Sequence, residues 1–228
     1  VIFYFYSINI FPLITNQFQN YFDLGGYMCS SWNTFWVWNK GQLNWLKSKI
    51  YKKFAYKIVN FVPFEDSAKN IKINQNKKIV TIFDVPPKNL FTMSQLVNPY
   101  NQYNFNYCKN FLEDIVYNPL LKNFIICVKI KRDYLGVDLR YRKLIKKIKQ
   151  KNNVKIFYNE TSAISLIKQS NFIISIPFTS TALIAKYFKK NNVYYNPYLY
   201  IKKSKFYPEG VKVLTKKTSL NRWLKKNN

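Results

Sequence analysis

Between residues 77 and 226, short runs of continuously apolar residues alternate with amphipathic segments, and this alternation constrains the fold more than any other feature. An apolar run bounded by turn residues is typical of a strand buried on both faces, and strands separated by helices form parallel sheets. The sequence contains six such strands and five such helices. It therefore predicts an α/β fold with a doubly wound, mainly parallel sheet of the Rossmann type.

Proline and hydroxyl residues mark the ends of these elements, with Pro86 and Pro87 closing the first strand and Pro119 ending the first helix. The predicted strands are residues 77–85, 123–130, 154–158, 171–176, 192–195 and 211–214. The predicted helices begin near Phe105, Asp138, Thr161, Thr179 and Ser219. Parallel sheets bind ligands at the carboxyl ends of their strands, so a functional site is expected in the loops that follow them.

Residues 1–62 differ from this pattern and hold four of the five tryptophans. Residues 34–38 predict a strand, and a basic amphipathic helix is expected from about Gln42 to Lys57. We divide the chain into residues 1–62, the end of an N-terminal domain with a linker helix, and residues 63–228, a Rossmann-like domain.

The first 14 residues are apolar, but a membrane-spanning helix needs about 20. Pro12 interrupts the run, which also lacks the basic start and cleavage site of a signal peptide. Aromatic and β-branched residues favour a buried strand here. Because the chain begins with Val1, we expect either processing or a longer parent protein.

The composition excludes several classes of protein. Aromatic residues make up 19% of the chain and apolar residues 48%, which is incompatible with intrinsic disorder. Histidine is absent, so a His-based zinc site, a Ser-His-Asp triad and a Cys-His pair are excluded. Cys29, Cys108 and Cys127 are too sparse for a disulfide framework and indicate a reducing compartment.

The net charge of +27 suits a nucleic-acid partner, but 33 of the 37 basic residues are Lys. Proteins that read bases or clamp phosphates favour Arg. Solvated lysines whose stems cover apolar surface are the simplest explanation. A basic patch that meets an anionic membrane or an acidic ligand is the next one, and no specific nucleic acid is expected.

Two loops that follow predicted strands are suited to phosphate. Lys129, Lys131 and Arg132 end one strand, and three cations there would suit a diphosphate; the alternative is an exposed basic turn. The strand at 171–176 is followed by Pro177, Phe178, Thr179, Ser180 and Thr181. The start of a helix attracts phosphate oxygens and hydroxyls add donors; the alternative is ordinary capping by Thr179.

Glu160 lies at the tip of another strand, just before a helix. Its carboxylate would accept hydrogen bonds from ribose hydroxyls, or would simply favour the start of the helix. Neither a G-x-G-x-x-G fingerprint nor a P-loop follows any strand, so a nicotinamide or flavin dinucleotide site is not expected.

Residues 172–197 resemble the polysaccharide-biosynthesis PFTS-motif family in three features: the tetrapeptide Pro177-Phe178-Thr179-Ser180, the helix after it, and Tyr194-Tyr195-Asn196-Pro197. The lysine-rich strand end at 129–132 and the aromatic passage around Trp38 are similar to that family too. The likeness covers roughly residues 30–215.

The resemblance implies a cytoplasmic glycosyltransferase of bacterial surface-polysaccharide synthesis, with the architecture of the C-terminal half of a GT-B enzyme. Its partners would be a nucleotide-sugar donor and a glycan or lipid-linked acceptor. Peripheral contact with an anionic membrane is an expectation from the basic charge. Residues 177–181 would face the donor phosphates, and Lys129, Lys131 and Arg132 would neutralise them. No cofactor or metal is expected, since the sequence has no Asp-x-Asp pair.

Transfer also needs a general base, which must be a carboxylate because histidine is absent. Asp84 is the best placed, at the end of the first strand of the alternation; the alternative is a turn-capping role. Two other functions stay open at this stage: a basic nucleic-acid-binding protein, and an inactive membrane-associated fragment that lacks its acceptor domain.

Overall fold

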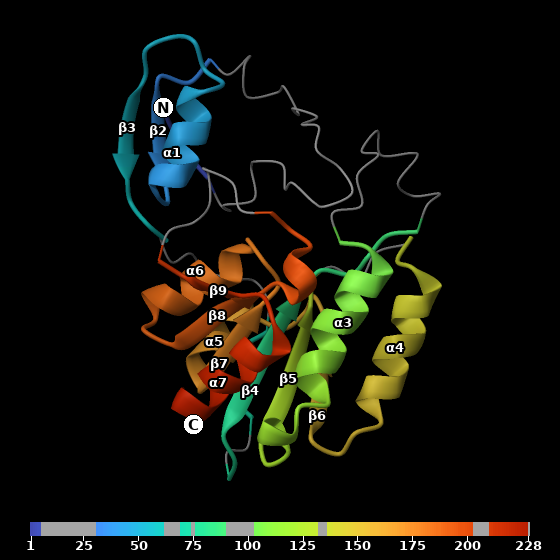
Figure 1. Ribbon diagram of the computed structural model, residues 1–228. Helices are drawn as coiled ribbons and strands as arrows, with labels where there is room; N and C mark the ends of the chain where they lie inside the picture. Colours follow the sequence, from blue (N-terminus) through green and yellow to red (C-terminus); the bar gives the residue numbers. More distant parts are fainter. Residues whose placement is uncertain are drawn as a thin grey trace.

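The computed structural model describes residues 1–5, 31–61, 69–73, 76–89, 103–131, 136–202 and 210–227, which form two parallel sheets with helices (Figure 1). The larger sheet has the strand order β6-β5-β4-β7-β8-β9, and the smaller sheet has the order β1-β2-β3. Every strand pairing in both sheets is parallel. The predicted doubly wound, mainly parallel α/β fold is therefore confirmed.

The larger sheet and the helices that cover it include every strand and helix predicted between residues 77 and 226. Its strands are β4 (Ile79–Asp84), β5 (Ile125–Ile130), β6 (Val154–Phe157), β7 (Phe172–Ser175), β8 (Asn191–Tyr195) and β9 (Lys212–Leu214). Its α-helices are α3 (Phe105–Val116), α4 (Leu139–Lys149), α5 (Ala163–Gln169), α6 (Ser180–Tyr187) and α7 (Lys217–Asn227), joined by the 3₁₀ turns η2 (Pro119–Leu121) and η3 (Pro197–Leu199). The central strands are buried because α3, α4 and α7 cover one face of the sheet and α5 and α6 the other.

The strand order places the point of ligand binding. From β4 at the centre, the chain moves outward through β5 to β6 and then returns to the opposite side of β4 with β7. The winding direction reverses between β4 and β7, and sheets of this kind bind ligands outside the carboxyl ends of the strands at that point. Asp84 and Ser175 end these two strands.

The smaller sheet consists of β1 (Ile2–Tyr4), β2 (Thr34–Val37) and β3 (Ala55–Ile58), with α1 (Lys40–Lys47) between β2 and β3. The strand predicted at 34–38 is confirmed by β2. The opening run forms β1, which is half-buried rather than buried, and its residues 6–14 lie outside the described part.

The helix predicted from Gln42 to Lys57 is wrong in its second half, because α1 ends at Lys47 and β3 follows. Ile50 and Phe54 continue the apolar spacing of the helix and pack on the same cluster as α1. They do so from non-helical backbone, so the spacing alone extends the helix too far.

The smaller sheet is joined to α6 by a chain of aromatic rings. Trp38 follows β2, and the centroid of its ring lies 5.3 Å from that of Phe61. The Phe61 ring centroid in turn lies 5.5 Å from that of Tyr187 of α6. Trp38 is 2% exposed, and its indole N–H donates to the carbonyl of Phe5. Among the described residues, none of the helices combines the length and the apolar character that crossing a bilayer requires.

We expect Trp38→Ala to lower the free energy of unfolding by about 3–5 kcal/mol, because a large buried ring is lost where the two sheets meet. Tyr51→Ala is the matched control: Tyr51 belongs to the same small unit but is 92% exposed, so its loss should change stability by less than about 0.5 kcal/mol. Urea denaturation followed by circular dichroism measures both. Equal effects of the two substitutions would contradict this role of Trp38.

Candidate functional site

The polar residues predicted from the sequence gather on one edge of the larger sheet. Asp84 ends β4, Lys131 follows β5 and residues 177–181 follow β7. β5 and β7 are the two neighbours of β4, and strands of a sheet lie about 4.8 Å apart, so the strand ends that Lys131 and residues 177–181 follow are about 10 Å apart. The two stretches therefore lie at the same carboxyl edge, one on each side of the reversal point.

The turn between β7 and α6, residues 177–180 (the PFTS turn), has an unusual backbone. Phe178 adopts a φ of 63°, in the left-handed region that non-glycine residues rarely occupy. Its side chain is 3% exposed and lies 5.2 Å, between ring centroids, from Tyr194. Such backbone strain persists only where the surroundings enforce it and is concentrated at functional sites.

Two tyrosine hydroxyls from distant segments hold this turn. Tyr194 of β8 donates to the carbonyl of Thr179 at 2.7 Å, and Tyr103, just before α3, donates to the carbonyl of Pro177 at 3.1 Å. Side chains from two distant segments thereby fix both carbonyls of the turn. The rings of Tyr194 and Tyr195 are buried in the core.

Three hydroxyls form a connected group at the start of α6. Ser175 and Thr181 lie 3.0 Å apart between their oxygens, and Thr181 and Thr179 lie 3.1 Å apart. Thr179 donates to the carbonyl of Ile176 at 3.1 Å. The group is mostly buried, and Ser175, at the end of a buried strand, is a member that the sequence analysis did not find.

The start of α6 differs from those of α1, α3, α4 and α5. Side chains cap α1, α3, α4 and α5 by accepting a hydrogen bond from a backbone N–H of the first turn. Thr179 occupies the corresponding position of α6 but makes no such bond, because its hydroxyl is turned toward Ile176. Ordinary capping by Thr179, the alternative left open above, is therefore absent. The start of α6 keeps the character of an anion-binding helix terminus.

Asp84 lies at this edge but is enclosed, with 1% of its surface exposed. The Tyr141 hydroxyl of α4 donates to its Oδ2, whereas its Oδ1 is buried without a hydrogen-bond partner among the described residues. Burial raises the pKa of Asp84 to about 7, and the Tyr141 hydrogen bond and the charge of Lys129 oppose that rise only in part. As placed, Asp84 joins β4 to α4, and its role as a general base stays a prediction.

The basic residues of the β5 loop differ in their surroundings. Lys129 is 8% exposed, and its amine donates to the carbonyls of Tyr158 at 2.8 Å and Ile130 at 3.3 Å, so it ties the ends of β5 and β6 together. Lys131 is half-buried at the end of β5. Arg132 lies outside the described residues.

Glu160 is exposed and follows β6. In the sheet, β6 lies three strand spacings, or about 14 Å, from β7. Its carbonyl accepts a hydrogen bond from the backbone N–H of Lys69 at 2.7 Å, which anchors this tip to residues 69–73. The proposed contact with ribose stays a prediction. In the described part of the chain, no three Cys, Asp or Glu side chains are grouped so that they could hold a metal ion.

Comparison with known families gives a match over nearly the whole chain. A family model described as "Polysaccharide biosynthesis PFTS motif protein" matches residues 1–224. The chain belongs to the polysaccharide-biosynthesis PFTS-motif family. The turn after β7 is the motif from which this family takes its name, and the predicted family is confirmed.

Solved structures share the fold at low identity. The pneumococcal O-GlcNAc transferase GtfA, in complex with UDP and GlcNAc, matches with a TM-score of 0.53 and 7% identity over 99% of this chain and 44% of that one. A mutant of S. aureus TarM, in complex with fondaparinux, alpha-GlcNAc-glycerol and UDP, matches with a TM-score of 0.46 and 14% identity over 86% of this chain and 36% of that one. No curated protein matched in the sequence search. The likeness to GtfA shows a shared fold, and the chain spans less than half the length of either structure.

We expect the stability of the protein to fall as the pH rises from about 4 to about 7. Between these values the folded state keeps a proton on Asp84 that the unfolded chain has released, so stability is lost by up to about 4 kcal/mol and is constant above that range. Asp84→Asn should abolish this decline. Urea unfolding at several pH values measures it.

Asp138→Asn is the control with the opposite sign. The hydrogen bond and charge of Arg140 lower the pKa of Asp138. The stability that ionised Asp138 contributes is therefore present at neutral pH and is lost as the pH falls. An Asp84→Asn variant with the same pH slope as the parent protein would show that Asp84 is not held protonated.

Proposed function

We propose that this chain is the donor-binding part of a glycosyltransferase of surface-polysaccharide biosynthesis. It binds the diphosphate of a nucleotide-sugar between the start of α6 and Lys131, and the sugar is transferred to a glycan or lipid-linked acceptor. The enzyme acts in the cytoplasm, at the inner face of an anionic membrane. Membership of the PFTS-motif family and the GT-B fold support this assignment.

The observation that carries the proposal is the start of α6. A helix terminus without a side-chain cap, three linked hydroxyls and a lysine one strand beyond β4 stand at the reversal point of a Rossmann-like sheet. The helix terminus and the lysine favour phosphate oxygens, whereas the linked hydroxyls donate to one another and to the carbonyl of Ile176 and so fix the start of the helix. The strained backbone at Phe178 positions the turn from which the helix begins.

In the reaction, negative charge grows on the leaving diphosphate as the bond to the sugar breaks. Groups that are already oriented toward this charge stabilise the transition state more than the ground state, because they need no rearrangement as it forms. The N-terminus of α6 and the amine of Lys131 would serve in this way. Asp84 stays a prediction for the base that accepts the proton of the acceptor hydroxyl.

The positions of the described lysines favour the proposed donor-binding function over nucleic-acid binding. Eight of these lysines lie in the last turns of five separate helices, where a cation offsets the helix dipole. These eight are Lys47, Lys146, Lys147, Lys149, Lys168, Lys186, Lys225 and Lys226. A structural role therefore accounts for part of the positive charge.

Lys131→Ala should weaken the binding of UDP at least about ten-fold, since a charge-assisted hydrogen bond contributes roughly 1.5–3 kcal/mol. Lys143→Ala, on the exposed side of α4, is the control and should leave binding unchanged. Titration calorimetry with UDP, GDP and CMP, and with the matching nucleosides, measures this. If none of the three nucleotides binds the parent protein, the proposed function is wrong.

We expect UDP affinity to survive EDTA within about two-fold, because the compensating charges belong to the protein backbone and to lysine, which need no metal. The same titration with and without Mg²⁺ measures it. Binding that requires Mg²⁺ would contradict the metal-independent form of the proposal.

A further inference from the structure

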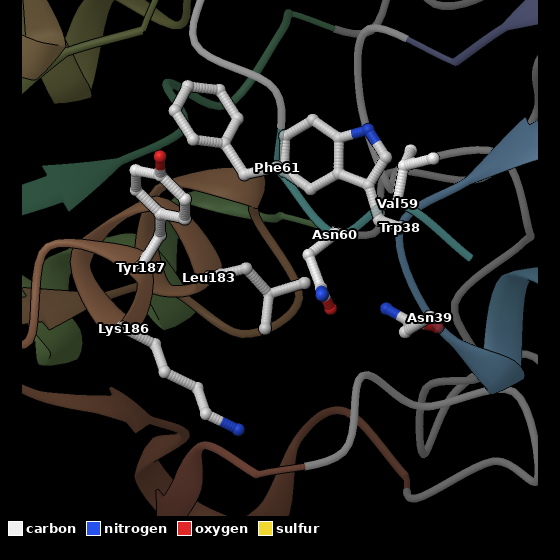
Figure 2. A pocket seen from close by; sticks show the side chains of 8 residues that line it. All are labelled: Trp38, Asn39, Val59, Asn60, Phe61, Leu183, Lys186 and Tyr187. Atoms are coloured by element: carbon white, nitrogen blue, oxygen red, sulfur yellow. The ribbon is translucent and has the colours of Figure 1, made fainter.

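A cavity of about 350 Å³ lies where the small sheet meets α6 (Figure 2). Trp38 and Asn39 reach it from the end of β2, Asn60 and Phe61 from the end of β3, and Lys186 and Tyr187 from α6. It is separate from the PFTS turn, none of whose residues lines it.

The position of the cavity follows the same rule as the donor site. The three strands of the small sheet are parallel, so the segments after β2 and β3 emerge at one carboxyl edge, where α/β sheets bind ligands. The opposite wall is α6, the helix that begins at the PFTS turn. With a rise of about 1.5 Å per residue, Lys186 stands about 10 Å along the helix axis from Thr179. The PFTS turn and the cavity therefore lie at different points along a single helix.

The walls combine aromatic and amide groups. The buried rings of Trp38 and Phe61 form a rigid apolar side, which suits the C–H faces of a sugar ring. Amide groups both donate and accept, as sugar hydroxyls require. Figure 2 shows the amides of Asn39 and Asn60 and the amine of Lys186 directed at one space. The Asn39 Oδ1 accepts from the backbone N–H of Gln42 at 2.9 Å, which fixes the orientation of this amide.

The charge of the walls selects the ligand further. Among the described residues that line the cavity, Lys186 is the one that is charged at neutral pH, and none of them is a carboxylate. Its amine lies against Gly210, where an added Cβ would come within 2.0 Å of the Nζ. A glycine at this point thus leaves room for the lysine to extend along the cavity.

We propose that this cavity is the acceptor subsite and that it takes a saccharide unit bearing an anionic group, either a carboxylate or a phosphate. The proposal rests on the function proposed above, since it names the acceptor of that reaction. Asn39 and Asn60 hold the hydroxyls, Trp38 and Phe61 form the apolar wall, and Lys186 pairs with the anion.

The test measures the binding of glucuronate, glucose 6-phosphate and glucose to the full chain, by the shift of the Trp38 indole N–H in ¹H–¹⁵N spectra. Both anionic sugars, or one of them, should bind at least about five-fold more tightly than glucose. The anionic sugar whose affinity exceeds that of glucose by the larger factor identifies the anionic group of the acceptor. Lys186→Gln should remove the difference, and Lys186→Arg should retain most of it.

Leu183→Trp, which fills the cavity from α6, should weaken the binding of all three sugars at least about ten-fold. The affinity for UDP should stay within about two-fold of that of the parent protein. Equal binding of glucose and both anionic sugars, or no effect of Lys186→Gln, would overturn the inference. So would loss of UDP binding in Leu183→Trp, because the cavity would then belong to the donor. Absence of UDP binding in the parent protein would instead count against the proposed function.

Discussion

The left-handed backbone of Phe178 is the constraint on which the candidate site depends. A conformation of this kind costs about 1–3 kcal/mol, and the surrounding structure must supply that energy. Two tyrosine hydrogen bonds to the turn contribute about 1 kcal/mol each, and burial of the Phe178 ring against Tyr194 adds to them. The motif at 177–180 and the tyrosines at 194–195 therefore form one unit, although they come from opposite ends of α6.

The same unit joins the site to the rest of the domain. Tyr195 donates to Asp114 of α3 at 2.6 Å, and Asp114 pairs with Lys217 of α7 at 3.1 Å. Asn196 accepts from the Tyr107 hydroxyl at 3.1 Å and donates to the carbonyl of Ile201. Segments from α3, β8 and α7 thus hold the strand end from which the Tyr194 hydroxyl reaches the PFTS turn, so that the geometry of the turn is a property of the whole fold.

The larger sheet could be predicted from the sequence because its central strands are buried on both faces and are mostly apolar. In the small sheet β2 was predictable, but β3 was not, since it is exposed along its whole length and carries no apolar run. At the site, the PFTS residues were predictable from local hydroxyl content. Their partners Tyr103, Ser175 and Tyr194 were not, because only the fold brings them to the turn. Likewise the sequence places Asp84 at a strand end but does not show that Tyr141, 57 residues away, encloses it.

The central claim is that phosphate oxygens meet the backbone at the start of α6. The backbone amide signals of Ser180, Thr181 and Ala182 in ¹H–¹⁵N spectra, recorded with UDP and with uridine, test it most directly. The account predicts that these three amides shift with UDP and stay in place with uridine. A second cavity of about 520 Å³, lined by Lys77, Lys122 and Lys155, lies at the opposite, amino edge of the sheet. Shifts confined to that edge, with the start of α6 unchanged, would contradict the account.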